Sequence, residues 1–353
     1  MERLKAIFLR ELAYSNKTVW ELLERSDRTL RESISTLKHL FKEGLINEEG
    51  GVFYLTEKGK QSINQKELHH KARICGVCGG KRIIAENGFK ELVERFSEIV
   101  KERPKPTLDY FQGYMVAEDV VARVALMHYY GDLCGKRIAL IGDDDLLSVA
   151  LALTQLPSRI TVLDIDRRLG DFITKVNSKY GFNIEYFEYN VANPLPKVLA
   201  GRFDVFSSEP LETLSGLKAF LIRGITCLKE GGVGYFGLTL HEASLRKWLE
   251  TQRLLSRMNC VITDIIQGFS SYPMDYSTVN YEEFAYNLGF RTEKNPGVTW
   301  YKSALIRFEA LSAPKLTYNR RMKVETVDEK EDLTHPTLYP KMLQQLNIKD
   351  ESG

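Results

Sequence analysis

Three adjacent carboxylates stand where a nucleotide-binding protein would place a glycine-rich turn. Asp143, Asp144 and Asp145 follow Gly142 directly, between a predicted buried strand and a predicted helix. A dinucleotide site needs glycines at this turn, because the backbone approaches the pyrophosphate closely and its amides bind the phosphate charge. Three negative charges would instead repel a pyrophosphate and attract a cation. The turn therefore disfavours NAD(P) and predicts a cationic ligand, although Asp145 is also placed to cap the helix.

Further polar side chains at strand ends indicate that this ligand contains adenosine. Asp164 and Asp166 follow the apolar run of residues 160–163. A carboxylate at the end of this strand can accept the hydroxyls of a ribose, and Asp164 is the better placed of the two. Asn190 follows a predicted strand at residues 183–187. Methyltransferase-type folds place there a side chain that accepts a hydrogen bond from the adenine amino group.

A cationic adenosine derivative is S-adenosylmethionine or its decarboxylated form. The carboxylate of S-adenosylmethionine would be repelled by the acidic turn. The decarboxylated form ends in an ammonium group without that carboxylate. The turn therefore favours decarboxylated S-adenosylmethionine.

The elements that must position these residues alternate between strand and helix from residue 107 to residue 311. Apolar strand patterns at residues 137–141, 160–163 and 203–206 are each followed by polar residues and then by a helical pattern. This alternation predicts an α/β fold, a doubly wound Rossmann-like sheet of the methyltransferase type. Ligands of such sheets bind at the carboxyl ends of the strands. Glu209, just after the strand at residues 203–206, is therefore expected at the same edge.

Residues 1–68 predict an N-terminal winged-helix domain, with two helices followed by a hairpin. Such a unit binds DNA through its second helix or serves as a packing or dimerisation module. Residues 1–70 contain 12 Lys and Arg against 11 Asp and Glu. This balance lacks the positive excess of a phosphate-binding surface, so a nucleic-acid partner is disfavoured.

Residues 69–106 predict a linker with a CxxC motif and an amphipathic helix. Cys75 and Cys78 resemble one half of a zinc knuckle, but a tetrahedral site needs four ligands and no second CxxC follows. A site completed by His70 or by a second chain, a disulfide and a linker remnant all remain open. No metal site is assigned.

The composition excludes collagen-like, mucin-like and mostly disordered proteins. The chain of 353 residues is 43% hydrophobic and 27% charged, and its 49 Lys and Arg nearly balance 47 Asp and Glu. No apolar run reaches the roughly 18 residues of a membrane span, and no signal peptide is apparent, so a cytoplasmic protein without a membrane partner is expected. Five cysteines are too few for a disulfide scaffold.

Three motifs resemble the branched-chain polyamine synthases of thermophiles, also called N4-bis(aminopropyl)spermidine synthases. They are residues 142–148 (GDDDLLS), 164–166 (DID) and 208–213 (SEPLET), and the resemblance extends over essentially the whole chain. It implies a transferase that moves aminopropyl groups from decarboxylated S-adenosylmethionine to the N4 amine of spermidine, twice in sequence. N4-aminopropylspermidine is then the intermediate acceptor, and methylthioadenosine leaves each time. The family also implies a homodimer and no cofactor beyond this co-substrate.

The resemblance, with the chemistry of amine alkylation, implies roles for the acidic residues. A protonated amine has no lone pair, so attack requires a base. Asp143, Asp144 and Glu209 are expected to bind the amine and accept its proton. The remaining expected substrate-binding residues are Gly142, Asp145, Asp164, Asp166, Asn190, Glu212, Gln112 and Tyr114.

Three other segments suggest further features of the site and the chain. Residues 271–276 form an aromatic loop that either covers the site as a lid or packs in the core. The pair His241 and Glu242 is interpreted as a solvated helix start. The tail, residues 312–353, has mixed charge and few apolar anchors, and either stays mobile or orders over the site.

Two alternative functions remain at this point. One is an S-adenosylmethionine-dependent methyltransferase that acts on nucleic acid and docks through the winged helix. The other is a transcription factor that senses a nucleoside. The acidic turn argues against the first, and the balanced charge of the N-terminal unit argues against the second.

Overall fold

The N-terminal unit has the order of helices and strands of a winged helix. The computed structural model describes residues 2–69, 72–328, 331 and 333–334. The unit forms a three-stranded sheet in the order β1-β3-β2. Its elements are α1 (Glu2–Tyr14), β1 (Lys17–Thr18), α2 (Val19–Glu24), α3 (Leu30–Lys42), β2 (Ile46–Glu49), β3 (Val52–Leu55), α4 (Glu57–Gln61) and α5 (Gln65–His69).

Helix α3 begins where a capping box satisfies its first backbone amides. The Thr29 hydroxyl accepts from the backbone N–H of Glu32, and the Glu32 carboxylate accepts from the backbone N–H of Thr29. This reciprocal pair uses amides that have no partner within the helix.

A larger α/β unit follows. Its strands are β4 (Arg137–Ile141), β5 (Arg159–Asp164), β6 (Ile184–Glu188), β7 (Phe203–Ser208), β8 (Leu228–Thr239), β9 (Cys260–Ser271) and β10 (Lys302–Ala310). Its helices are α6 (Gly88–Val100), α7 (Ala117–Tyr129), α8 (Leu147–Thr154), α9 (Arg167–Tyr180), α10 (Leu214–Cys227) and α11 (Leu245–Arg257). Short 3₁₀ helices are η1 (Leu108–Tyr110), η2 (Lys197–Leu199), η3 (Glu283–Asn287) and η4 (Leu316–Tyr318).

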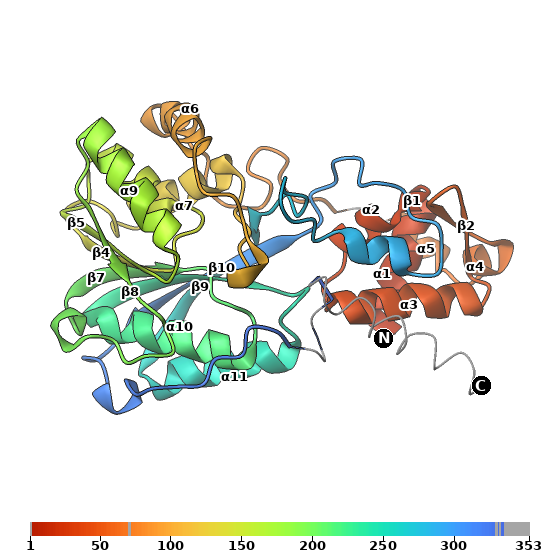
Figure 1. Cartoon of the computed structure of the whole chain (residues 1–353). Helices are drawn as coiled ribbons and strands as arrows, with labels where there is room; N and C mark the ends of the chain where they lie inside the picture. Colours follow the sequence, from red (N-terminus) through yellow and green to blue (C-terminus); the bar gives the residue numbers. More distant parts are fainter. Residues whose placement is uncertain (1, 70–71, 329–330, 332, 335–353) are drawn as a thin grey trace.

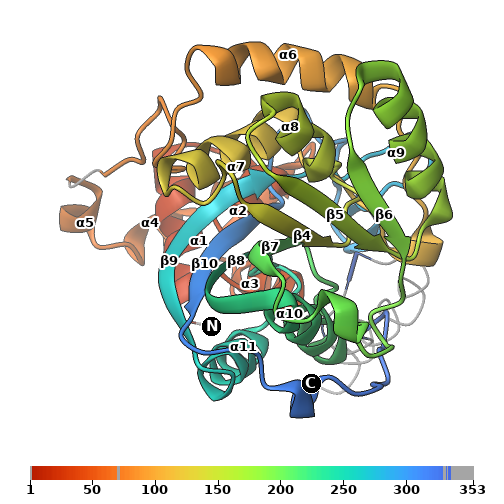
Figure 2. The same ribbon diagram turned by 90° about the vertical axis from the view of Figure 1, so that its left-hand side faces the viewer.

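The seven strands form one sheet in the order β6-β5-β4-β7-β8-β10-β9. Strands β4 to β8 pair in parallel, and β10 lies antiparallel between β8 and β9. Helices α7, α8 and α9 cover one face, and α10 and α11 cover the other (Figures 1 and 2). The predicted doubly wound Rossmann-like sheet of the methyltransferase type is confirmed.

This topology brings separate parts of the sequence to one edge. Strand β4 lies between β5 and β7, and all three run parallel. Their carboxyl ends therefore meet, which places Gly142, Asp164 and Glu209 on three neighbouring strand ends. The chain order separates these residues by more than a helix each, so only the sheet makes them neighbours.

The N-terminal unit lies at one end of the molecule, against the segment that joins β9 to β10 (Figure 1). Trp20 of α2 and Trp300 of that segment are each 1% exposed, and their ring centroids are 5.9 Å apart. Burial of two such large rings ties the two units together. Within the described residues, no helix combines the length and apolar character needed to cross a membrane.

Candidate active site

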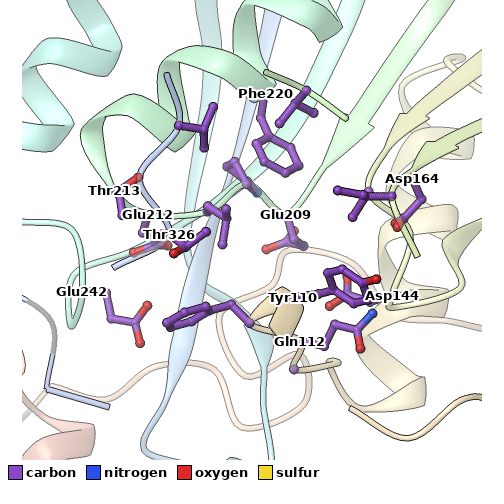
Figure 3. Close-up of a pocket in the computed structure, with 18 of the residues that line it drawn as sticks. Tyr110, Gln112, Asp144, Asp164, Glu209, Glu212, Thr213, Phe220, Glu242 and Thr326 are labelled. Atoms are coloured by element: carbon purple, nitrogen blue, oxygen red, sulfur yellow. The ribbon is translucent and has the colours of Figure 1, made fainter. Parts of the chain in front are cut away.

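A cavity of about 400 Å³ opens at the carboxyl edge of the sheet. This volume is in the range of small-molecule sites. Its lining comes from the turn after β4, the ends of β5, β7 and β8, and four residues beyond β10, namely Val324, Thr326, Asp328 and Thr334. Figure 3 shows Glu209 near the middle of the lining, with Asp144 and Asp164 on one side and Glu212 and Glu242 on the other.

The three aspartates after β4 point in different directions. The Asp143 carboxylate accepts from the backbone N–H of Ser148 at 3.1 Å, and so caps the first turn of α8. The Asp145 carboxylate accepts from the backbone N–H of Met115 at 2.6 Å. Asp144 lines the cavity, and within the described chain its carboxylate makes no hydrogen bond or ion pair. Asp144 is therefore the member of the turn that is open to a ligand.

This geometry corrects two expectations. Leu146 holds the N-cap position of α8, and the carboxylate that accepts from the first turn is that of Asp143, whereas the sequence suggested Asp145 as the cap. Neither Asp143 nor Asp145 is among the residues that line the main cavity. We therefore leave Asp143 out of the catalytic set that we propose below.

Burial raises the pKa values of the turn carboxyls. It raises the pKa of Asp144 well above its usual range, and the charges of Asp145 and Asp164 raise it further. Burial and the charge of Glu209 raise the pKa of Asp145 to about 7, and burial raises that of Asp164 to about 6. A cation in the cavity would stabilise the ionised forms. The grouped carboxyls therefore favour a positively charged ligand.

Glu209 at the end of β7 is held by two partners. Its Oε1 accepts from the buried guanidinium of Arg123 on α7, and its Oε2 accepts from the hydroxyl of Tyr272 at 2.7 Å. A Cβ at Gly237 would stand 1.8 Å from Oε2, so a side chain at this position of β8 would displace the Glu209 carboxylate from its partners. Because both oxygens already accept hydrogen bonds, Glu209 is better suited to hold the cavity wall than to take a proton.

The end of the cavity near β4 and β5 brings together several residues that the sequence assigned to nucleoside binding. Asp164, Asn190, Gly142 and Phe220 all line it. The Asp164 carboxylate accepts from the backbone N–H groups of Asp143 and Asp166, at 2.9 and 2.8 Å. These bonds orient it toward the turn, so that it can accept further bonds from a ribose. Gly142 has a φ of +77°, which a residue with a side chain rarely adopts.

Two expected binding residues have structural roles instead. Asp166 does not line the cavity; it caps α9 and accepts from Gln112 at 2.8 Å and from Arg168 at 2.6 Å. Tyr114 also lies outside the lining, because its ring packs on Tyr276 with centroids 4.8 Å apart. Gln112 does line the cavity, held in place by its bond to Asp166.

A second acidic group lies at the opposite end. Glu212 accepts from the backbone N–H of Thr239 at 2.6 Å and from its hydroxyl at 2.5 Å. Burial and the charge of Glu242 raise the pKa of Glu212 to about 8. Glu242 lines the cavity and accepts from the Thr334 hydroxyl at 2.7 Å. The interpretation of His241 and Glu242 as a solvated helix start is wrong, since His241 is buried and α11 begins later, at Leu245.

Aromatic rings join the two acidic ends. Tyr272, Tyr281 and Tyr301 line the cavity together with Met274. Tyr272 and Met274 belong to the aromatic loop of residues 271–276, so this loop forms part of the wall. Aromatic faces are suited to ammonium groups. Arg123 and Tyr301 were missed from the sequence, because each reaches the site from an element without a recognisable motif, whereas Glu242 was noticed but interpreted as part of a solvated helix start.

Part of the tail completes the lining. Val324, Thr326 and Asp328 face the cavity, and the Thr213 hydroxyl donates to the backbone carbonyl of Glu325 at 2.6 Å. Glu325 also donates its backbone N–H to the Ser215 hydroxyl at 2.9 Å, so this part of the tail lies at the start of α10. The expectation for the tail beyond residue 334 lies outside the described residues.

The cysteines do not contribute to this site. All five are free thiols, and Cys75 is exposed. Among the described residues, no three His, Cys, Asp or Glu side chains are grouped as metal ligands. His70, which was considered as a further ligand, lies outside the described residues.

Comparison with known proteins identifies relatives along most of the chain. Residues 91–334 match the family described as the branched-chain polyamine synthase A C-terminal domain. The chain is 41% identical to the N(4)-bis(aminopropyl)spermidine synthase of Thermococcus kodakarensis over 301 residues, which cover 84% of this chain and 85% of that one. It is 35% identical to the enzyme of the same name from Thermus thermophilus, over 89% of both chains.

A solved structure has the same fold. The crystal structure of the branched-chain polyamine synthase of Thermus thermophilus matches with a TM-score of 0.82 and 34% identity, covering 94% of this chain and 93% of that one. That protein was crystallised with N4-aminopropylspermidine and 5'-methylthioadenosine.

Proposed function

The chain belongs to the branched-chain polyamine synthase family, and from this premise we propose how its cavity performs aminopropyl transfer. The enzyme transfers aminopropyl groups from decarboxylated S-adenosylmethionine to the N4 amine of spermidine. A second transfer, to N4-aminopropylspermidine, gives N4-bis(aminopropyl)spermidine. Decarboxylated S-adenosylmethionine is a co-substrate that is consumed.

The reaction is a displacement at carbon. The N4 lone pair attacks the methylene next to the sulfonium, the new N–C bond forms, and the C–S bond breaks with its electron pair on sulfur. Methylthioadenosine leaves as a neutral thioether. Since N4 is protonated in free spermidine, its proton must leave before attack.

We assign the proton to Asp144. Its carboxylate faces the cavity without a protein partner in the described chain, and burial raises its pKa, which makes the ionised carboxylate a stronger proton acceptor. This open carboxylate between the nucleoside end and the aromatic wall is the observation that carries the assignment. In the second transfer the acceptor is the tertiary amine of N4-aminopropylspermidine, and Asp144 accepts the proton of its ammonium form in the same way.

The other lining residues form two ends of the cavity, one for each substrate. We propose that Asp164 and Asn190 bind the adenosine, with Gly142 allowing its close approach. Glu212 and Glu242 then bind a terminal ammonium of the polyamine, while Tyr272 and Tyr301 lie along its aliphatic chain. Glu209, neutralised by Arg123, holds Tyr272 in the wall between the two ends.

The test supplies the enzyme with decarboxylated S-adenosylmethionine and spermidine. We expect methylthioadenosine release and two successive additions, followed by chromatography and mass spectrometry. Two controls should give no product: S-adenosylmethionine as the donor, and the diamine in which a methylene replaces the central nitrogen of spermidine. Turnover of that diamine, or none with spermidine, would contradict the proposed acceptor. The homodimer remains a prediction of the family resemblance, to be checked by the molar mass in solution.

A further inference from the structure

Helix α3, the second helix of the helix-turn-helix pair α2 and α3, packs against another part of the same chain. In a DNA-binding helix-turn-helix, the first residues of this helix reach the base edges. Here the backbone N–H of Leu30, the first residue of α3, donates to the carbonyl of His241 at 2.9 Å, and Leu30 is 1% exposed. The start of α3 therefore lies against the loop that carries Glu242 of the cavity.

A continuous series of aromatic contacts runs from this unit to the cavity. Trp20 packs on Trp300 with centroids 5.9 Å apart, and Trp300 packs on Tyr301 at 5.5 Å. Tyr301, in the cavity wall, packs at 5.6 Å on Tyr272. The Tyr272 hydroxyl donates to Glu209. Each contact is between packed rings or hydrogen-bonded groups, so a displacement of Trp20 passes to the wall.

Hydrogen bonds fix the rings at the start of this series. The Trp20 indole N–H donates to the carbonyl of Glu293 at 3.0 Å, and that of Trp300 donates to the Glu282 carboxylate at 2.7 Å. The buried ring of His241 packs between Trp300 and Tyr301, with centroid distances of 5.5 and 5.9 Å. His241 thus links the start of α3 to the same aromatic group.

Charge at the start of α3 points to the same end of the cavity. Arg31 follows Leu30, and burial lowers its pKa while the charge of Asp328 opposes that change. Asp328 lines the cavity and pairs with Lys247 at 3.0 Å. The first turn of α3 and the acidic end of the cavity are therefore electrostatic neighbours.

We propose that the winged-helix unit positions the polyamine end of the active site, with Trp20 as its main positioning residue. The inference rests on the proposed function. The unit positions Tyr301 through Trp300, on which Trp20 packs. It positions Glu242 through the hydrogen bond from Leu30 to the neighbouring residue His241. The nucleoside end is formed at β4 and β5. In the sheet, β7 and β8 separate these strands from β10, which Tyr301 directly precedes, so the nucleoside end is expected to be independent of Trp20.

The test compares two buried aromatic residues of the same unit. Trp20→Leu removes the start of the aromatic series. Phe53→Leu, the matched control, removes a ring that packs on Phe290 at 5.1 Å and is not part of that series. Initial rates of methylthioadenosine release give kcat and KM for each substrate, measured below the melting temperature of every variant.

Trp20→Leu should raise KM for spermidine about tenfold, the effect of losing one well-packed aromatic contact. KM for decarboxylated S-adenosylmethionine should change by less than about twofold, and Phe53→Leu should leave the ratio of the two KM values as in the unmodified enzyme. Equal changes in both KM values, or the same split in Phe53→Leu, would overturn the proposal. No turnover in the unmodified enzyme would instead contradict the proposed function.

Two further measurements test the proposal if Trp20→Leu does not fold. Trp20→Phe keeps a ring but loses the indole bond to Glu293, and should raise KM for spermidine by about threefold with KM for the donor unchanged. An unchanged KM for spermidine would count against the role of Trp20. Salt-dependent binding of duplex DNA to the unmodified enzyme would also overturn the proposal, because the start of α3 would then have to leave His241.

Discussion

Replacement of Asp144 by asparagine separates its chemical role from its contribution to the fold. The substitution keeps the size of the side chain and removes the negative charge and the ability to accept a proton. The carboxylate makes no hydrogen bond or ion pair within the described chain, so no structural contact is lost. Catalysis should therefore fail while the fold is retained.

Two estimates of the loss agree. An ammonium about 4 Å from one carboxylate, at an effective dielectric constant of about 20, gains about 4 kcal/mol. Since about 1.4 kcal/mol corresponds to a factor of ten, this is a loss of about 10³ in kcat/KM for spermidine. Removal of a general base costs about 10² to 10⁴ in rate. The free energy of unfolding should stay equal or rise, because burial disfavours the Asp144 carboxylate.

The assay measures methylthioadenosine release at saturating donor, together with calorimetric binding of methylthioadenosine and thermal melting. Asp143→Asn is the matched control, since its remaining oxygen can still accept from the Ser148 N–H. We expect this control to lose at least an order of magnitude less activity than Asp144→Asn. Methylthioadenosine should bind both variants as it binds the unmodified enzyme.

Comparable losses in the two variants would refute the reasoning, because they would show that the negative charge of the turn matters but the orientation of Asp144 does not. Activity of Asp144→Asn within about threefold of the unmodified enzyme would exclude Asp144 as the base.

Three further predictions concern charge and packing. The pKa of Glu212 is raised from 4.5 to about 8, so between these two values the folded protein holds a proton that the unfolded chain has lost. As the pH rises through this window, the free energy of unfolding should fall by up to about 1.4 kcal/mol per pH unit. In denaturant melts at several pH values, Glu212→Gln should show a smaller dependence of the free energy of unfolding on pH. Spermidine should lower the raised pKa values and release protons, so its calorimetric binding enthalpy should vary with the ionisation enthalpy of the buffer; equal enthalpies in two buffers would contradict this. Gly237→Ala should displace Glu209 and reduce kcat by about 10², because the new Cβ stands 1.8 Å from Oε2, whereas Gly88→Ala, which meets no atom within 4 Å, should retain full activity.

Much of the fold could be predicted from local patterns. Buried strands are continuous apolar runs, and each is followed by a turn and an amphipathic or apolar helix, so the alternation of β4, α8 and β5 is visible in the chain. General rules of parallel connection then reduce the number of possible strand orders, and the structure supplies the order itself. Asp164 and Glu209 were found because polar residues directly after such runs must lie at the carboxyl edge.

The direction of each side chain within the acidic turn could not be predicted. Three consecutive aspartates are equivalent in composition, but only the backbone of the turn decides which one faces the cavity. Leu146 adopts a left-handed φ of +57° before α8, and Asp143 folds back onto that helix. A pattern of residue types does not specify this local conformation.

Contacts between distant elements were equally inaccessible. The pairing of Arg123 with Glu209 joins residues 86 positions apart, and Glu242 reaches the cavity because its loop is held by α3. Tyr114 was expected in the cavity from its loop, but packing on Tyr276 turns it away. Such contacts depend on how whole elements pack, and packing is set by volume and shape across the core.

The sequence by itself determined the class of fold, the edge at which ligands bind and the sign of the charge they must carry. These depend on hydrophobic periodicity and on the residue types at strand ends, which are local properties. Only the tertiary structure decided that Asp144 is the open carboxylate, that Glu242 and Tyr301 form the opposite end of the cavity, and that α3 supports this end. These depend on the positions of atoms in elements far apart in the chain, which become neighbours only when the core has packed.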